Sequence, residues 1–173
     1  MVRAGKSAAP VPATKIASAQ LDLTTFLTDP EVAAGNRVSI VVDVEPKPGM
    51  HVYAPGAVGY RVIGLTIAPQ PFVRVLPPTY PASEIYHFKP LNERVPVFRK
   101  PFRIVQDVLI EGTSQAQAAW RQRTNVTLAG TLEYQACDDK VCFNPVSVPV
   151  SWTVALKRLV TERPLAPPAA TPR

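Results

Sequence analysis

The stretch Arg37–Glu45 reads RVSIVVDVE and alternates apolar with polar residues. Its apolar positions in phase are Val38, Ile40, Val42 and Val44, and Val41 is the exception. Successive side chains of a β-strand point to opposite faces, so this alternation predicts a strand with one face in a hydrophobic core. The prolines and the glycine within residues 46–49 follow directly and end the predicted strand.

The same alternation recurs in three other long segments, at residues 102–111, 126–136 and 146–156. Shorter apolar runs at residues 16–23, 63–67 and 72–75 predict further strands, and residues 114–121 give the one weak indication of a helix. The chain contains 20 prolines, which favour short strands joined by rigid turns. We therefore predict an all-β fold, an immunoglobulin-like antiparallel β-sandwich.

The length of 173 residues suits one domain with tails. Residues 1–13 and 161–173 are rich in proline and alanine, and they predict a leader and a tail around a domain at residues 14–160. The net charge is +6, but the basic residues form no run, so we expect no nucleic-acid binding. No apolar stretch is long enough to span a bilayer, so we expect no stable membrane insertion of this segment.

Residues 76–93 break the alternation and hold four prolines together with three aromatic residues. Long irregular segments are uncommon in compact domains and often carry function. A cap over a site and a proline-rich crossover between the two sheets are both consistent with this segment.

Cys137 and Cys142 are the two cysteines of the chain, and they lie between two predicted strands. We therefore expect them at the tip of a β-hairpin, close enough to form a disulfide. Cys137 continues the outward parity of Thr131, Glu133 and Gln135. Its sulfur is therefore expected to face solvent or a covering loop, away from the core.

Four kinds of site could use these cysteines. A zinc site would have to use His51 and His87, which lie far apart in the sequence and lack the spacing of a zinc finger. Blue copper would need a histidine, and usually a methionine, soon after the ligand cysteine, and neither follows Cys142. We therefore predict no metal and no cofactor. A structural disulfide closing so short a loop would contribute only about 2 kcal/mol. A redox-active pair at an exposed tip would exchange with a partner thiol. The last two alternatives both remain open on the residues alone.

The run Tyr134-Gln-Ala-Cys137, followed by Cys142-Phe-Asn-Pro145, resembles the active-site hairpin of one family. This is the family of the amino-terminal periplasmic domain of the thiol–disulfide interchange protein DsbD. Residues 48–53 (PGMHVY) resemble the glycine-aromatic turn of that family, and residues 83–86 (SEIY) resemble the stretch after its cap loop. The resemblance covers roughly residues 20–157.

The resemblance implies a thiol–disulfide oxidoreductase domain of immunoglobulin-like fold. Such a domain takes electrons from a thioredoxin-like protein or domain and passes them to disulfide-containing proteins in the periplasm. Cys142 would form the mixed disulfide with partners, and Cys137 would resolve it. His51 and Tyr53 would lie beside the cysteines, and residues 76–82 would form the cap, with Tyr80 as the nearest aromatic.

We also expect Asp138, Asp139 and Phe143, which flank the cysteines in the sequence, to form part of the wall of the site. Glu133 and the two aspartates put negative charge near the pair, which Lys140 offsets only in part, and this charge disfavours a thiolate. No helix N-terminus is expected nearby, so we predict no strongly lowered pKa for Cys142. The alternative function is a non-catalytic β-sandwich interaction module whose hairpin disulfide is structural. The redox function would place the domain outside the cytoplasm, as part of a longer exported or membrane-anchored chain.

Overall fold

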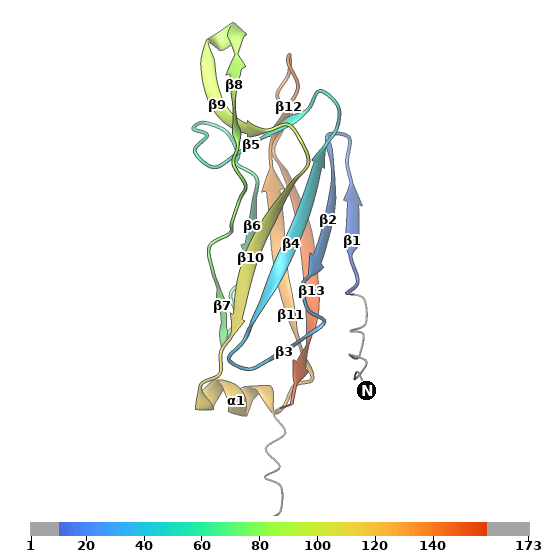
Figure 1. Ribbon diagram of the computed structural model, residues 1–173, viewed down its shortest axis with the longest axis vertical. Helices are drawn as coiled ribbons and strands as arrows, with labels where there is room; N and C mark the ends of the chain where they lie inside the picture. The colour runs from blue at the N-terminus through green and yellow to red at the C-terminus, as the bar shows by residue number, and fades with distance from the viewer. Residues whose placement is uncertain (1–10, 159–173) are drawn as a thin grey trace, which may run out of the picture.

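The computed structural model describes residues 11–158, which form two packed β-layers (Figure 1). One layer is an antiparallel sheet of five strands in the order β1 (Thr14–Ala17), β2 (Leu21–Leu27), β4 (Arg37–Pro46), β10 (Phe102–Ile110) and β7 (Val73–Val75). The other contains β3 (Glu31–Ala33), β13 (Val146–Lys157), β11 (Asn125–Tyr134) and β6 (Gly64–Ile67). Apolar side chains from both layers form the main core, which confirms the predicted all-β, immunoglobulin-like sandwich.

A third, smaller sheet lies at one end of the sandwich, at the top of Figure 1. Its strands are β12 (Ala136–Cys137), β5 (His51–Tyr53), β9 (Glu93–Phe98) and β8 (Glu84–Phe88), and the short 3₁₀ helix Lys89–Leu91 joins β8 to β9. Helix α1 (Ser114–Trp120) lies at the opposite end. The third sheet has its own small apolar cluster of Tyr53, Val95, Val97 and Cys137.

The four long alternating segments form the strands β4, β10, β11 and β13, with the predicted faces inward. Gln106 interrupts the apolar face of β10 in the sequence, and it is buried in the structure. Its side-chain amide donates a hydrogen bond to the carbonyl of Leu76, which supplies a partner for one polar group in the core. Period-two patterning therefore located these strands in spite of one polar residue on an inward face.

Pro149 faces outward on β13, where the sequence suggested an edge or a bulge. Strand β13 pairs with β11 along most of its length, but with β3 only at residues 155–157. The β3–β13 pair is also parallel, in contrast to the antiparallel pairs around it. Pro149 therefore lies on a stretch of β13 that pairs with β11 alone, where the missing N–H disrupts no second ladder.

Three expectations about local structure were wrong. Residues 16–23 form a hairpin of two strands because Ser18 makes a turn: its hydroxyl oxygen accepts a hydrogen bond from the N–H of Leu21. The predicted strand 126–136 ends at Tyr134, and residues 136–137 pair with β5 instead. The irregular segment 76–93 contains strand β8 and the start of β9.

The predicted leader and tail lie almost wholly outside the described residues. Of the predicted leader, residues 11–13 are described, and Val11 packs against the main core. The predicted helix is confirmed as α1, which begins after Thr113, whose hydroxyl accepts a hydrogen bond from the N–H of Ala116. Within residues 11–158, no helix is long and apolar enough to cross a membrane.

Candidate functional site

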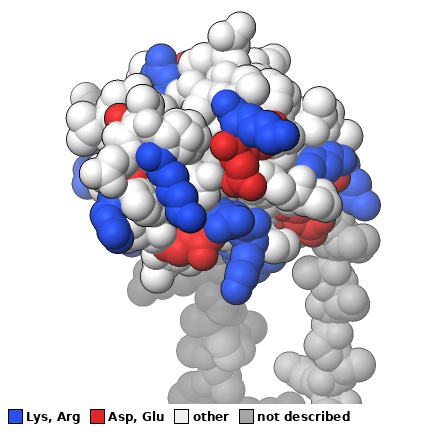
Figure 2. Space-filling model, turned by 90° about the horizontal axis from the view of Figure 1, so that it is seen from above, with Lys and Arg blue, Asp and Glu red and all other residues white. Residues whose placement is uncertain are grey.

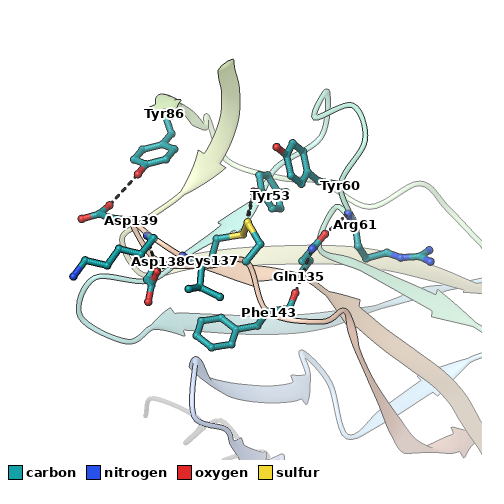
Figure 3. The surroundings of a disulfide bond; sticks show 12 residues. Tyr53, Tyr60, Arg61, Tyr86, Gln135, Cys137, Asp138, Asp139 and Phe143 are labelled. Atoms are coloured by element: carbon teal, nitrogen blue, oxygen red, sulfur yellow. Dashed lines mark hydrogen bonds between the residues drawn. A yellow bond between two sulfur atoms is a disulfide. The ribbon is translucent and has the colours of Figure 1, made fainter. Parts of the chain in front are cut away.

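Cys137 and Cys142 form a disulfide at the end of the molecule that carries the third sheet (Figure 3). Their Cα atoms are 4.1 Å apart. The backbone N–H of Asp138 donates to the carbonyl of Val141, and the N–H of Phe143 donates to that of Ala136. The hydrogen bonds of the loop therefore bring the two sulfur atoms together, as the sequence predicted from the hairpin position.

The side chain of Asp138 fixes the loop from within. Its Oδ1 atom accepts hydrogen bonds from the N–H groups of Lys140 and Val141, each at 2.7 Å. Because both bonds stabilise the charged carboxylate, they lower the pKa of Asp138 below its usual value. At neutral pH the loop is therefore held by an ionised side chain that belongs to the loop itself.

The two cysteines differ strongly in exposure. Cys137 is 1% exposed, whereas Cys142 is exposed on the surface. The expectation that Cys137 continues the outward parity of β11 was wrong, because the ladder of β11 ends at Tyr134 and Cys137 pairs with His51 of β5. Cys137 therefore enters the small apolar cluster of the third sheet, and Cys142 is the cysteine that solvent or a partner reaches.

Tyr53, at the end of β5, lies against the disulfide. Its hydroxyl oxygen is 3.1 Å from the Sγ atom of Cys137 and 3.4 Å from that of Cys142. Burial is the main factor that raises the pKa of Tyr53, and neighbouring Tyr60 adds to it. The hydroxyl therefore keeps its proton at neutral pH and provides a hydrogen-bond donor beside both sulfur atoms.

Tyr60 holds the ring of Tyr53 from the other side. The two rings are stacked, with centroids 4.1 Å apart and an interplanar angle of 13°. The hydroxyl of Tyr60 donates a hydrogen bond to Glu93, at the start of β9. Because Glu93 lies on β9, this contact ties the loop that follows β5 to the β8–β9 hairpin and closes one side of the site.

His51 is buried beneath the aromatic residues, with only 2% of its surface exposed. Its ring contacts that of Tyr53 edge to face, with the ring centroids 5.7 Å apart. The centroid of the Tyr86 ring lies 4.5 Å from that of His51. Burial lowers the pKa of His51 and nearby Arg99 lowers it further, against the opposing effect of Asp139 and Asp138. The imidazole is therefore neutral at pH 7.

Asp139 lies on the outer side of the loop and meets the β8–β9 hairpin. Its Oδ1 atom accepts a hydrogen bond of 2.9 Å from the hydroxyl of Tyr86 (Figure 3). Tyr86 belongs to β8, and its ring lies under the guanidinium group of Arg99, which is 5.5 Å from the ring centroid. The two ends of this hydrogen bond thus belong to elements far apart in the sequence.

The predicted cap does not cover the cysteines. Tyr80, in the predicted cap segment 76–82, packs against the main core, and its hydroxyl donates to the carbonyl of Ile63. Residues of the β8–β9 hairpin and Tyr60 lie beside the disulfide instead and leave Cys142 exposed. The residues that line the small pocket at the disulfide are His51, Tyr53, Tyr60, Tyr86, Phe88, Val95, Cys137, Asp138, Val141 and Cys142.

Phe143 is another expected wall residue outside the pocket lining, from which Tyr80 and Asp139 are also absent. Its ring points to the side of the loop away from Tyr53 (Figure 3), and it does not line the pocket at the disulfide. Its carbonyl accepts a hydrogen bond from the side chain of Gln135. Phe143 therefore contributes to the base of the hairpin rather than to the surroundings of the sulfur atoms.

Tyr60, Phe88, Val95 and Glu93 are parts of this site that sequence reasoning missed. Tyr60 lies in a glycine-containing loop without periodic pattern, and the other three lie in or beside strands that the sequence did not predict. Tyr86 was visible in the SEIY stretch but was not assigned to the site. These residues lie far from the cysteines in the sequence, so no local sequence pattern predicts their contacts with the site.

Charge is unevenly distributed on this end of the molecule. Figure 2 views it from above: the charged side chains lie across the middle and lower parts of the view, and the uppermost part is mostly uncharged. A larger surface hollow is lined by Tyr80, Glu133 and Gln135 among others, and it does not include the sulfur atoms. The disulfide therefore lies at a small pocket rich in aromatic residues and not at this hollow.

The sequence matches one protein family, described as the N-terminal part of the thiol:disulfide interchange protein DsbD, over residues 23–151. No curated protein is similar enough in sequence to match the chain.

Two solved structures resemble the fold at low sequence identity. The N-terminal periplasmic domain of ScsB from Proteus mirabilis is 12% identical with a TM-score of 0.48, and the alignment covers 82% of this chain and 49% of that one. The reduced DsbD n-terminal domain from Neisseria meningitidis is 15% identical with a TM-score of 0.45, covering 68% and 81%. The chain thus spans about half the length of the ScsB structure.

Proposed function

Because this chain belongs to the family of the N-terminal domain of the thiol:disulfide interchange protein DsbD, we propose that it relays electrons between proteins through the Cys137–Cys142 pair. The electron donor is a thioredoxin-like protein or domain, and the acceptor is a disulfide-containing protein. The activity is that of a thiol–disulfide oxidoreductase, and it takes place in the periplasm or another compartment outside the cytoplasm.

The observation that carries this proposal is the difference in exposure between the two cysteines. Thiol–disulfide exchange begins when a thiolate attacks one sulfur of a disulfide, and that sulfur must be accessible. Cys142 is exposed, while Cys137 is 1% exposed. A partner therefore attacks Cys142, and Cys137 is the leaving group.

The relay then proceeds in two balanced half-reactions. In the first, a donor thiolate attacks the Sγ atom of Cys142, the Cys137–Cys142 bond breaks, and Cys137 leaves as a thiolate. The second thiolate of the donor then attacks the donor sulfur that is bonded to Cys142 in the mixed disulfide, and Cys142 is released. The domain gains two electrons and two protons, and the donor becomes a disulfide.

In the second half-reaction the direction is reversed. The thiolate of Cys142 attacks the acceptor disulfide and forms a mixed disulfide, and one acceptor sulfur leaves as a thiolate. Cys137 then attacks Cys142, restores the intramolecular disulfide and releases the reduced acceptor. The short loop supports this step because its backbone hydrogen bonds keep the two sulfur atoms close.

Tyr53 has a defined role in this scheme. When Cys137 leaves, negative charge develops on a sulfur atom in an apolar cluster, which is unfavourable without a donor. The hydroxyl of Tyr53 lies 3.1 Å from that sulfur and donates a hydrogen bond to the thiolate. His51 is neutral and buried, and it supports the ring of Tyr53 rather than exchanging protons.

The alternative is a β-sandwich interaction module in which the disulfide is structural. A short loop that backbone hydrogen bonds already close gains little from a disulfide as a stability device. The contact of a tyrosine hydroxyl with both sulfur atoms also favours a role in exchange. These two features support the relay over the structural disulfide.

The test is a measurement of the redox equilibrium followed by trapping. The domain is equilibrated with glutathione buffers, and free thiols are counted by alkylation and mass spectrometry. A reduction potential of roughly −180 to −270 mV, within the range of known exchange proteins, is the expected result. A disulfide that resists reduction until the domain unfolds would make it structural and end the relay proposal.

Trapping assigns the attacked sulfur. The single cysteine of the Cys137→Ala variant is first converted to a mixed disulfide with thionitrobenzoate. A thioredoxin-like protein that lacks its resolving cysteine should then attack the sulfur of Cys142, release thionitrobenzoate and accumulate as a mixed disulfide with the domain. The matched Cys142→Ala variant keeps only the buried sulfur and should form much less of this species. Equal trapping by the two variants would contradict the assignment of Cys142.

A further inference from the structure

The hydrogen bond between Tyr86 and Asp139 connects the redox loop to a different part of the molecule. Tyr86 lies on β8, and Asp139 lies between the two cysteines. The oxygen atoms are 2.9 Å apart. Among the described residues, this is the one side-chain hydrogen bond that joins the segment 138–141 to another element, since both side-chain bonds of Asp138 stay within the loop.

Tyr86 is held in place by contacts that do not involve the loop. Its ring packs 4.5 Å from that of His51 and lies under the guanidinium group of Arg99. Arg99 forms an ion pair of 3.7 Å with Glu84, two residues before Tyr86 on the same strand. The hydroxyl of Tyr86 therefore offers a fixed donor, to which the loop is attached through Asp139.

The protonation states suit this arrangement. Burial and the hydrogen bond to Asp139 both raise the pKa of Tyr86, so its hydroxyl remains a donor at neutral pH. Asp139 then serves as the charged acceptor, and bonds to a charged acceptor are stronger than those between neutral groups.

We propose that Tyr86 is a positioning residue that acts through Asp139 to hold the 137–142 loop in the geometry of the disulfide, and so favours the oxidised form of the pair. This inference rests on the proposed function, in which the pair cycles between two redox states. The hydroxyl of Tyr86 contacts Asp139 and neither sulfur atom, so its role in that cycle is indirect.

The physical argument follows from linkage. Reduction breaks the bond between the sulfur atoms, adds two electrons and two protons, and leaves two thiols at a longer, non-bonded separation. We expect the loop to adjust to this longer separation, so that a hydrogen bond formed in the oxidised geometry is weaker in the reduced one. A contact that is stronger in one of two states shifts the equilibrium toward that state by the difference.

The experiment uses the full chain and glutathione as the redox probe. Two glutathione molecules become one glutathione disulfide as the pair is reduced. The Tyr86→Phe variant keeps the ring and loses the donor, so its ratio of oxidised to reduced protein at fixed glutathione should fall by about twofold to tenfold. An Asp139→Ala variant should show a similar fall, and Asp139→Asn, which keeps an acceptor but loses its charge, should recover part of it.

A double-mutant cycle separates the hydrogen bond from a general effect on structure. If Tyr86 acts through Asp139, the Tyr86→Phe/Asp139→Ala double variant should shift the ratio no more than either single change. Tyr134→Phe is the matched control, because its hydroxyl donates to Ser18, outside the redox loop. Its ratio should stay within twofold of the wild type.

The outcomes are distinct for the two proposals. If the wild-type disulfide cannot be reduced while the domain is folded, the relay fails. If the wild type is reducible but Tyr86→Phe leaves the ratio unchanged or raises it, the relay stands and the role of Tyr86 is overturned. Additive effects in the double variant would also overturn it.

Discussion

The hydroxyl oxygen of Tyr53 lies 3.1 Å from the Sγ atom of Cys137. Cys137 is the buried member of the pair, so a donor stands beside the sulfur that cannot be stabilised by water. The same hydroxyl is 3.4 Å from the Sγ atom of Cys142. One side chain therefore contacts both atoms between which the disulfide forms and breaks.

Replacement of Tyr53 by phenylalanine should slow reduction of the disulfide. The thiolate of Cys137 would form without its hydrogen bond, and hydrogen bonds to charged groups contribute about 1.5–3 kcal/mol, which corresponds to a rate loss on the order of tenfold or more. Quenched-flow alkylation after addition of dithiothreitol measures the rate. Tyr80→Phe is the control, since its hydroxyl bonds to the carbonyl of Ile63. An unchanged rate in the Tyr53 variant would remove this residue from the mechanism.

Alkylation of the reduced domain should distinguish the two thiols. Because Cys142 is exposed and Cys137 is 1% exposed, iodoacetamide should modify Cys142 faster, by about tenfold or more. Peptide mass spectrometry over time gives both rates. In urea the two rates should converge, which provides the internal control. Equal rates in the folded protein would mean that both sulfur atoms are accessible there.

The stability of the domain should fall as the solution is acidified below pH 6.5. Burial lowers the pKa of His51 from 6.5, so below that pH the unfolded chain binds a proton that the folded chain does not. This difference reduces the free energy of unfolding as pH falls, by at most about 1.4 kcal/mol per pH unit. Urea unfolding between pH 7.5 and 5.5 measures the slope. The His51→Asn variant should show a flatter profile, and an equal slope would exclude His51 as the cause.

A buried hydrogen-bond chain between the two layers should matter for stability. The indole N–H of Trp152 donates to the hydroxyl of Thr25, which in turn donates to the carbonyl of Val41. Thr25→Val keeps the shape but leaves the indole N–H unpaired, so the free energy of unfolding should drop by about 1–3 kcal/mol. Thr127→Val, which breaks an exposed contact with Thr153, is the matched control and should change it little. Equal losses would show that burial does not govern the effect.

The strands of the sandwich could be predicted because their pattern is local. Val38, Ile40, Val42 and Val44 share one face of β4 through the geometry of a single extended segment, whatever the rest of the chain does. The same holds for β10, β11 and β13. The proximity of Cys137 and Cys142 could also be predicted, because few residues separate them between two strands.

The sequence alone thus determined the sandwich and the pairing of the cysteines, and its resemblance to the DsbD family pointed to their chemistry. The tertiary structure decided the burial of Cys137, the place of Tyr80 against the main core, and the contacts of Tyr60 and Tyr86 around the disulfide. The physical reason is that alternation follows from the backbone geometry of one segment. These placements depend instead on packing between segments that lie far apart in the chain. Several of these segments pair in the third sheet, which no periodic pattern in the sequence predicts.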